Sequence, residues 1–156
     1  MGVYLNPGNR EFYQAVRSKI YVDKTMLIAH TNSVLDTEQK YISVSRPRRF
    51  GKSIAVNMLA AYYGRGCDSR ELFSNFKIAK SPTFEEHLNK YNVIRINMRN
   101  ALTRGKTVEG MIAILEKNDC NGAEKRVAGC GVLGYRLHVL SGGRVHADRY
   151  SICIYY

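Results

Sequence analysis

The chain has 156 residues, of which 45% are hydrophobic and 24% are charged, and its formal net charge is +11. This length and composition indicate a globular domain and exclude a wholly disordered chain. No apolar run approaches the roughly 20 residues of a membrane-spanning helix and no signal peptide is visible, so we expect a cytoplasmic protein without a membrane partner. The positive charge leaves two interpretations open, a nucleic-acid partner or a solvated basic surface. We favour the second, because net charge governs association and solubility rather than fold.

The predicted elements alternate between strands and helices. Short β-prone runs indicate the strands, and apolar residues at helical spacing indicate the helices. Such alternation is typical of βαβ units and a parallel sheet, which makes the fold class α/β. In chain order the elements are an apolar segment over 12–29 with a short extended piece at 20–22, a strand over 41–45, a helix over 53–63, a short helix within 81–91, a strand over 93–98 and a helix after Thr107.

The chain changes character at Asn118. Residues 118–156 hold six of the thirteen glycines and three of the four cysteines, and they show no convincing period. The apolar piece at 151–156 is a candidate strand, but we expect the tail as a whole to be irregular. The sequence therefore divides into a domain over 1–117 and a tail over 118–156.

The loop between the predicted strand at 41–45 and the helix at 53–63 carries the chemistry. It reads Ser-Arg-Pro-Arg-Arg-Phe-Gly-Lys-Ser from Ser45 to Ser53. In a phosphate-binding loop, backbone N–H groups and the positive end of the helix dipole face the β-phosphate, and Gly51 lets the backbone approach it closely. Lys52 would reach the β- and γ-phosphates, and the Ser53 hydroxyl would be a ligand of Mg²⁺.

The predicted site consists of consecutive residues that surround the Gly-Lys-Ser tripeptide. Arg46 stands where the usual pattern has its first Gly, so a basic turn that caps a helix stays open as the alternative. Arg48 and Arg49 also have two interpretations of equal weight, neutralisation of phosphates or a solvated loop face. The predicted nucleotide-binding residues are Arg48, Arg49, Phe50, Gly51, Lys52, Ser53 and Ile54.

Two sequence blocks give a more specific indication. The blocks Tyr-Val-Asp-Lys-Thr at 21–25 and Arg-Pro-Arg-Arg-Phe-Gly-Lys-Ser at 46–53, followed by Met58-Leu59 and Leu72-Phe73, resemble the N-terminal part of the AAA-ATPase-like domain family over roughly residues 2–117. In that family an Arg replaces the first Walker A Gly, so Arg46 is the residue expected there. The resemblance implies ATP and Mg²⁺ as cofactors. It also implies part of a P-loop NTPase fold, a three-layer α/β/α sandwich with a parallel sheet.

The resemblance also implies elements that this sequence does not contain. In the family a later apolar strand ends in acidic residues, the Walker B motif, which help to hold Mg²⁺ and to activate water. No Asp-Glu dipeptide occurs here, so ATP binding is predicted while hydrolysis, and with it an enzymatic activity, stays open. Since the resemblance stops near Asn118, we expect residues 118–156 to be a frame-shifted, non-homologous or disordered tail on a truncated gene.

Three questions remain open at this stage. A basic nucleic-acid-binding module that uses the cluster at 46–52, or an inactive gene fragment, would explain the sequence without a nucleotide. The roles of Asp23, Lys24 and Thr25 are open as well, because a polar cluster of this kind either contacts the nucleotide or caps the following helix. The oligomeric state is not indicated.

Overall fold

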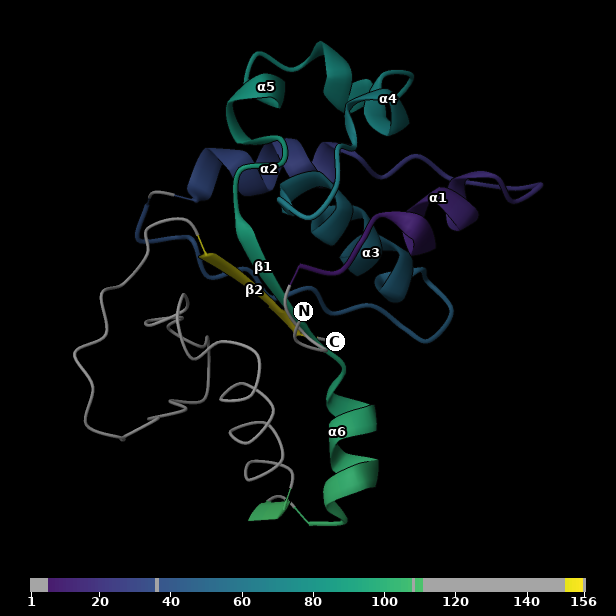
Figure 1. The fold of residues 1–156 in the computed structure, drawn as a ribbon, viewed down its shortest axis with the longest axis vertical. Coiled ribbons are helices and arrows are strands. Elements are labelled where there is room, and N and C mark those ends of the chain that lie inside the picture. Colours follow the sequence, from purple (N-terminus) through teal and green to yellow (C-terminus); the bar gives the residue numbers. More distant parts are fainter. Residues whose placement is uncertain (1–5, 36, 108, 111–150, 156) are drawn as a thin grey trace. The chain divides into compact units, whose positions relative to one another are not determined.

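The computed structural model describes residues 6–35, 37–107, 109–110 and 151–155, which form two compact units. One unit is Gly8–Tyr91, and the other combines Met1–Pro7 with Asn92–Tyr156. Figure 1 labels their helices and strands. In chain order these are α1 (Arg10–Val16), α2 (Met26–Val34), α3 (Lys52–Tyr63), α4 (Arg70–Phe73), the 3₁₀ helix η1 (Lys77–Lys80), α5 (Phe84–His87), β1 (Asn92–Ile96), α6 (Met98–Gly105) and β2 (Ser151–Tyr155).

The unit Gly8–Tyr91 has an aromatic core around the C-terminal half of α3. The Phe12 ring of α1 stacks on Phe73 with 5.1 Å between ring centroids, and Tyr62 meets the same Phe73 ring edge-on at 5.6 Å. Rings in these arrangements contribute attraction beyond the area that they bury. The helix expected at 53–63 is confirmed as α3. Of the apolar residues at helical spacing, Met58 and Tyr62 are buried in this core, whereas Ile54 is exposed. The buried residues of α3 are Val56, Met58, Ala60, Ala61, Tyr62 and Tyr63.

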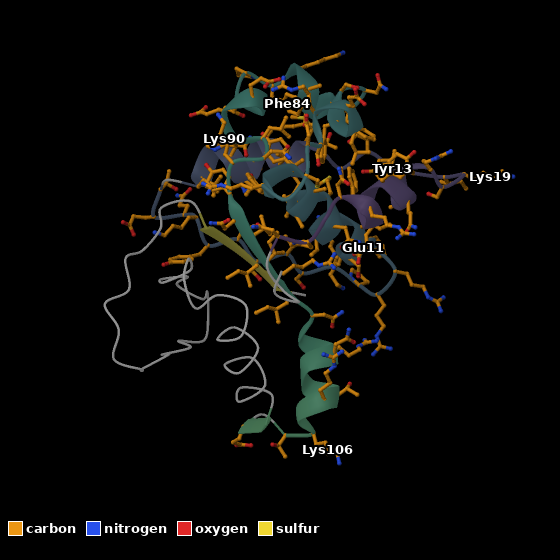
Figure 2. The ribbon with its side chains drawn as sticks, in the orientation of Figure 1. Glu11, Tyr13, Lys19, Phe84, Lys90 and Lys106 are labelled. Carbon is orange, nitrogen blue, oxygen red and sulfur yellow. The ribbon has the colours of Figure 1, made fainter. Side chains whose placement is uncertain are left out.

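A buried polar network joins α2 to α3. The Asn32 side-chain amide donates hydrogen bonds to Tyr62 Oη (3.1 Å) and to Thr83 Oγ1 (3.2 Å), and Tyr63 Oη donates one to Asn32 Oδ1 (2.6 Å). Tyr62 Oη also donates to the carbonyl of Phe84 (2.8 Å), the residue labelled on α5 in Figure 2. Burial raises the pKa of Tyr62 to about 12. The network satisfies polar groups that would otherwise destabilise the core.

In the second unit, β1 and β2 pair in parallel. The register places Asn92 opposite Ser151 and Ile96 opposite Tyr155. Asn6 also binds the start of β1, since its backbone N–H donates to the Val93 carbonyl and its side-chain oxygen accepts from the Val93 N–H, both at 2.7 Å. The strand predicted at 93–98 is confirmed but ends at Ile96, because α6 begins at Met98.

The strand β2 corrects one expectation about the tail. Residues 118–156 were expected to be irregular, yet Ser151–Tyr155 form a strand, in agreement with the candidate at 151–156. The run Ser-Ile-Cys-Ile-Tyr contains β-branched and aromatic residues that favour a strand once a partner is present. The remainder of the tail lies outside the described residues.

Other predicted elements differ from the structure. Residues 40–47 form neither helix nor strand, so the strand predicted at 41–45 is wrong, and 20–22 are irregular as well. A β-prone run becomes a strand only where a ladder partner exists, and the side chains of Tyr41 (55%) and Val44 (50%) are largely exposed. The short helix within 81–91 is confirmed as α5. The helix predicted after Thr107 falls mostly outside the described residues, although 109 and 110 are helical.

The described residues thus form helices and one pair of parallel strands, which agrees with the predicted mixed α/β class. The predicted three-layer α/β/α sandwich is not seen among these residues. None of the helices in the described part of the chain is long and apolar enough to cross a membrane.

Candidate functional site

The loop before α3 contains two residues with left-handed backbone conformation. Arg49 has φ 68° and Gly51 has φ 75°, whereas Phe50 between them does not have a positive φ. Gly51 (φ 75°, ψ 27°) is the N-cap of α3, so a left-handed residue is followed directly by the right-handed Lys52. Successive residues of opposite hand turn their N–H groups toward one concavity, which suits an anion. The backbone at the start of α3 therefore forms a nest, a concavity of N–H groups of the kind that suits an anion.

The first turn of α3 adds donors to this nest. The N–H group of Ala55 donates to the Gly51 carbonyl at 3.0 Å, and this is a hydrogen bond of the regular helical kind. The N–H groups of Lys52, Ser53 and Ile54 precede that bond and have no carbonyl one turn earlier within the helix. Gly51 has no side chain with which to cap them. These donors and the positive end of the helix dipole point in the direction from which a phosphate would approach.

Lys52 folds back over its own loop. Its ammonium group donates hydrogen bonds to the carbonyl of Arg46 and, at 3.1 Å, to the carbonyl of Pro47. Both bonds are exposed to solvent. A cation binds anionic oxygens more strongly than neutral carbonyl oxygens, so these are bonds that an anion could replace.

The remaining residues of the predicted site lie at the surface. Arg46, Arg48, Arg49, Lys52 and Ser53 are exposed. The side chains of Phe50 (58%) and Ile54 (40%) are also exposed. The seven predicted residues are consecutive from the loop to the first turn of α3, and Arg48, Arg49 and Lys52 are the cations among them.

The segment 21–25 is held in place by the residues around 77 and 78. Asp23 accepts hydrogen bonds from the backbone N–H of Thr25 (2.8 Å) and from that of Lys77 (3.2 Å), and Thr25 Oγ1 accepts one from the N–H of Ile78 (3.3 Å). Burial tends to raise the pKa of Asp23, but these hydrogen bonds outweigh it and hold the pKa below its ordinary value. Thr25 is fully buried. Asp23 and Thr25 therefore make contacts that stabilise the fold of this segment.

Lys24, between them, contacts the loop. Its ammonium group donates a hydrogen bond of 2.6 Å to the carbonyl of Phe50. A Cβ atom at Gly51 would lie 3.0 Å from Lys24 Nζ, so the missing side chain at Gly51 leaves room for this lysine. The sequence did not place Lys24 in the site. Its position in a block shared with the family was the available signal, but nothing in that block indicates which of its three polar residues faces the loop.

Metal binding has a narrow basis in the described residues. Among them there is no group of three or more His, Cys, Asp or Glu side chains that could hold a metal ion. The Ser53 hydroxyl, on the first turn of α3, is the predicted ligand, and it would act together with the phosphate oxygens of a bound nucleotide.

Comparison with known proteins gives a match to a protein family. The family described as predicted AAA-ATPase matches residues 10–128, a range that contains the segment 21–25, the loop and the whole of α3. No curated protein matches the chain, and no solved structure matches it either.

Proposed function

This chain belongs to the predicted AAA-ATPase family, and we propose that residues 48–54 are its ATP-binding loop. Backbone N–H groups from Phe50 to Ile54 bind the β-phosphate, and Arg48 and Arg49 neutralise phosphate charge from the loop. Membership of the family supports nucleotide binding in general. The assignment to these residues rests on their own geometry.

The observation that carries the proposal is the backbone of Gly51 and the start of α3. The left-handed Gly51 followed by the right-handed Lys52 forms an N–H nest, and α3 supplies further N–H donors without intrahelical partners. A Ser, Asp or Asn at this position could accept from these donors with its own side chain, whereas Gly51 has none. Gly51 leaves the donors for a ligand instead.

In the proposed complex, Lys52 exchanges its carbonyl partners for phosphate oxygens. An ammonium group has three N–H donors, and Lys52 directs its donors at the carbonyls of Arg46 and Pro47. Charge-assisted hydrogen bonds to the β- and γ-phosphates are roughly twice as strong as bonds to neutral groups, so the exchange favours binding. The Ser53 hydroxyl binds the Mg²⁺ ion that accompanies the nucleotide.

We extend the proposal to the fold and to catalysis. A parallel strand pair such as β1 and β2 suits a P-loop three-layer α/β/α sandwich, and we propose that the chain is part of one. We expect little or no hydrolysis by this chain alone, because its sequence has no Asp-Glu pair after an apolar strand to activate water.

The test is the affinity for Mg²⁺-ATP of the wild type, of Lys52→Ala and of Lys19→Ala, measured by calorimetry. Lys19 is an exposed cation that Figure 2 shows at the outer end of the segment after α1, so its removal matches the change in charge. We expect Lys52→Ala to weaken binding roughly 10- to 100-fold, since it removes charge-assisted hydrogen bonds. We expect Lys19→Ala to stay within about twofold of the wild type.

Two results would contradict the proposal. One is equal affinity in all three proteins, and the other is no measurable affinity in the wild type. Binding of single-stranded nucleic acid that falls steeply with salt and is indifferent to added ATP would instead favour the exposed arginines as a nucleic-acid surface.

A further inference from the structure

We propose that Lys24 is a positioning residue of the phosphate site, which holds the Phe50–Gly51 peptide group so that the Gly51 N–H faces the ligand. The role rests on the proposed function, since it assumes that the nest at Gly51 receives a phosphate. The observation behind it is the hydrogen bond of 2.6 Å from Lys24 Nζ to the Phe50 carbonyl, which joins residues 26 positions apart in the chain.

The backbone of Lys24 is fixed on both sides. Asp23 and Thr25 are bound to the backbone of Lys77 and Ile78, so the chain cannot shift at either neighbour without breaking hydrogen bonds. The Lys24 carbonyl itself accepts from the N–H of Leu27 at 3.0 Å, in the first turn of α2. Lys24 is exposed between a partly buried and a fully buried neighbour, and its side chain extends from this anchored point to the loop.

The geometry of the peptide group transmits the effect of this bond. The described part of the chain has no cis peptide bonds, and in a trans peptide the C=O and N–H groups point in opposite directions. When Lys24 holds the Phe50 oxygen on one side, the Gly51 N–H is therefore directed to the other side. This N–H belongs to the nest, so Lys24 acts on the ligand through the backbone.

Gly51 is the reason why the orientation of the Phe50–Gly51 peptide group has to be fixed by a hydrogen bond. Glycine adopts positive and negative φ with similar ease, so the peptide group before it can rotate at little cost. The same glycine provides the space, because a side chain there would lie 3.0 Å from Lys24 Nζ. The two lysines therefore differ in kind. Lys52 gives up its loop carbonyls to the nucleotide, whereas Lys24 keeps its carbonyl while the nucleotide is bound.

The experiment compares Lys24→Met, which keeps an unbranched apolar side chain but has no donor, with Lys24→Arg, which keeps a donor and the charge. Lys19→Ala is the control for charge, and Lys52→Ala reports on the proposed function. For each variant of the full chain we would measure the affinity for Mg²⁺-ATP, the midpoint of thermal unfolding and the NMR chemical shift of the Gly51 amide without ligand.

We expect Lys24→Met to bind ATP roughly fivefold more weakly, because an exposed charge-assisted hydrogen bond is lost, and Lys24→Arg to stay within about twofold of the wild type. The Gly51 amide shift should change in Lys24→Met and not in Lys19→Ala. The midpoint of thermal unfolding should be unchanged in both, since the bond lies at the surface.

Each other outcome overturns the role of Lys24. Wild-type affinity in Lys24→Met, combined with weak binding by Lys52→Ala, would remove Lys24 from the site and leave the proposed function standing. Weak binding with an unchanged Gly51 amide would mean that the lysine acts by its charge alone. Failure of Lys24→Arg to restore affinity would exclude a hydrogen-bond donor as the cause, and absence of binding by the wild type would remove the proposed function as well.

Discussion

The two ends of α3 have opposite environments. At the N-terminal end, Lys52, Ser53 and Ile54 are exposed, and the loop before them is bound by two lysine ammonium groups. At the C-terminal end, Tyr62 and Tyr63 are fully buried. One end of the helix is therefore packed into the core, and the other lies at the surface, where we propose that it binds the nucleotide.

The hydrogen bonds at the two ends differ in the same way. Those of Lys24 and Lys52 run from exposed ammonium groups to backbone carbonyls, so water competes with each partner. Those of Asn32 with Tyr62 and Tyr63 are buried, and no water can replace a partner that is lost. Substitutions at the C-terminal end should therefore change the free energy of unfolding, and substitutions at the N-terminal end should change ligand affinity.

The largest expected effect is that of Phe73→Ala. The Phe73 ring is fully buried between Phe12 and Tyr62, and truncation of such a ring leaves a cavity and removes its transfer free energy. We expect the free energy of unfolding to fall by about 4 kcal/mol, measured by urea denaturation. The matched control is Phe50→Ala, the same change at a side chain that is 58% exposed, which should cost less than about 1 kcal/mol. Equal losses in the two variants would mean that the loop before α3 contributes as much to stability as the core around its C-terminal end.

A smaller loss is expected for Asn32→Ala. The substitution removes a donor and an acceptor from the buried network and leaves the hydroxyl groups of Tyr62 and Tyr63 with fewer partners. We expect a loss of about 2 kcal/mol in the free energy of unfolding and an unchanged affinity of the folded protein for ATP. Asn75→Ala, at an exposed position, serves as control and should change the stability by less than about 0.5 kcal/mol. If Asn32→Ala changed the affinity for ATP while Asn75→Ala did not, the two ends of α3 would not be independent of each other.

The parts of the fold that were predictable are those that neighbouring residues determine. The helix over 53–63 and the loop before it follow from apolar spacing and from a Gly-Lys-Ser tripeptide, all within a few positions of one another. The left-handed conformation of Gly51 is a further reason for glycine at this position, beside the close approach to a phosphate that the sequence predicts. The nucleotide itself remains a prediction, since the family match supports it only in general.

The parts that were not predictable depend on residues far apart in sequence. The β-prone run at 41–45 did not become a strand, whereas Ser151–Tyr155 did because β1 pairs with it. The roles within 21–25 follow from contacts with Phe50, Lys77 and Ile78, and no local pattern reveals them. For this reason the sequence assigns no role to Lys24, although the block that contains it resembles the family.

The smallest expected effect is that of Tyr21→Phe, at the start of the segment that connects the core to the loop. The Tyr21 ring packs edge-on against Phe12 and Phe76, and its buried hydroxyl has no hydrogen-bond partner among the described residues. A phenylalanine keeps the ring contacts and removes an unsatisfied group, so at pH 7 we expect the free energy of unfolding to stay within about 0.5 kcal/mol of the wild type or to rise slightly. A loss above about 1 kcal/mol would mean that the hydroxyl makes a hydrogen bond after all.

The same variant should differ from the wild type in alkaline solution. Burial, with the nearby charge of Asp23, raises the pKa of Tyr21 to about 12, whereas an unfolded tyrosine titrates near pH ~10. A raised folded-state pKa contributes stability that is complete below the unfolded pKa and is lost as the pH rises toward the folded pKa. The wild type should therefore lose stability between pH ~10 and pH ~12 on account of Tyr21, and Tyr21→Phe should lose less. Urea denaturation of both proteins at pH 7 and near pH ~11 measures the difference, and parallel losses would show that the hydroxyl is accessible to water.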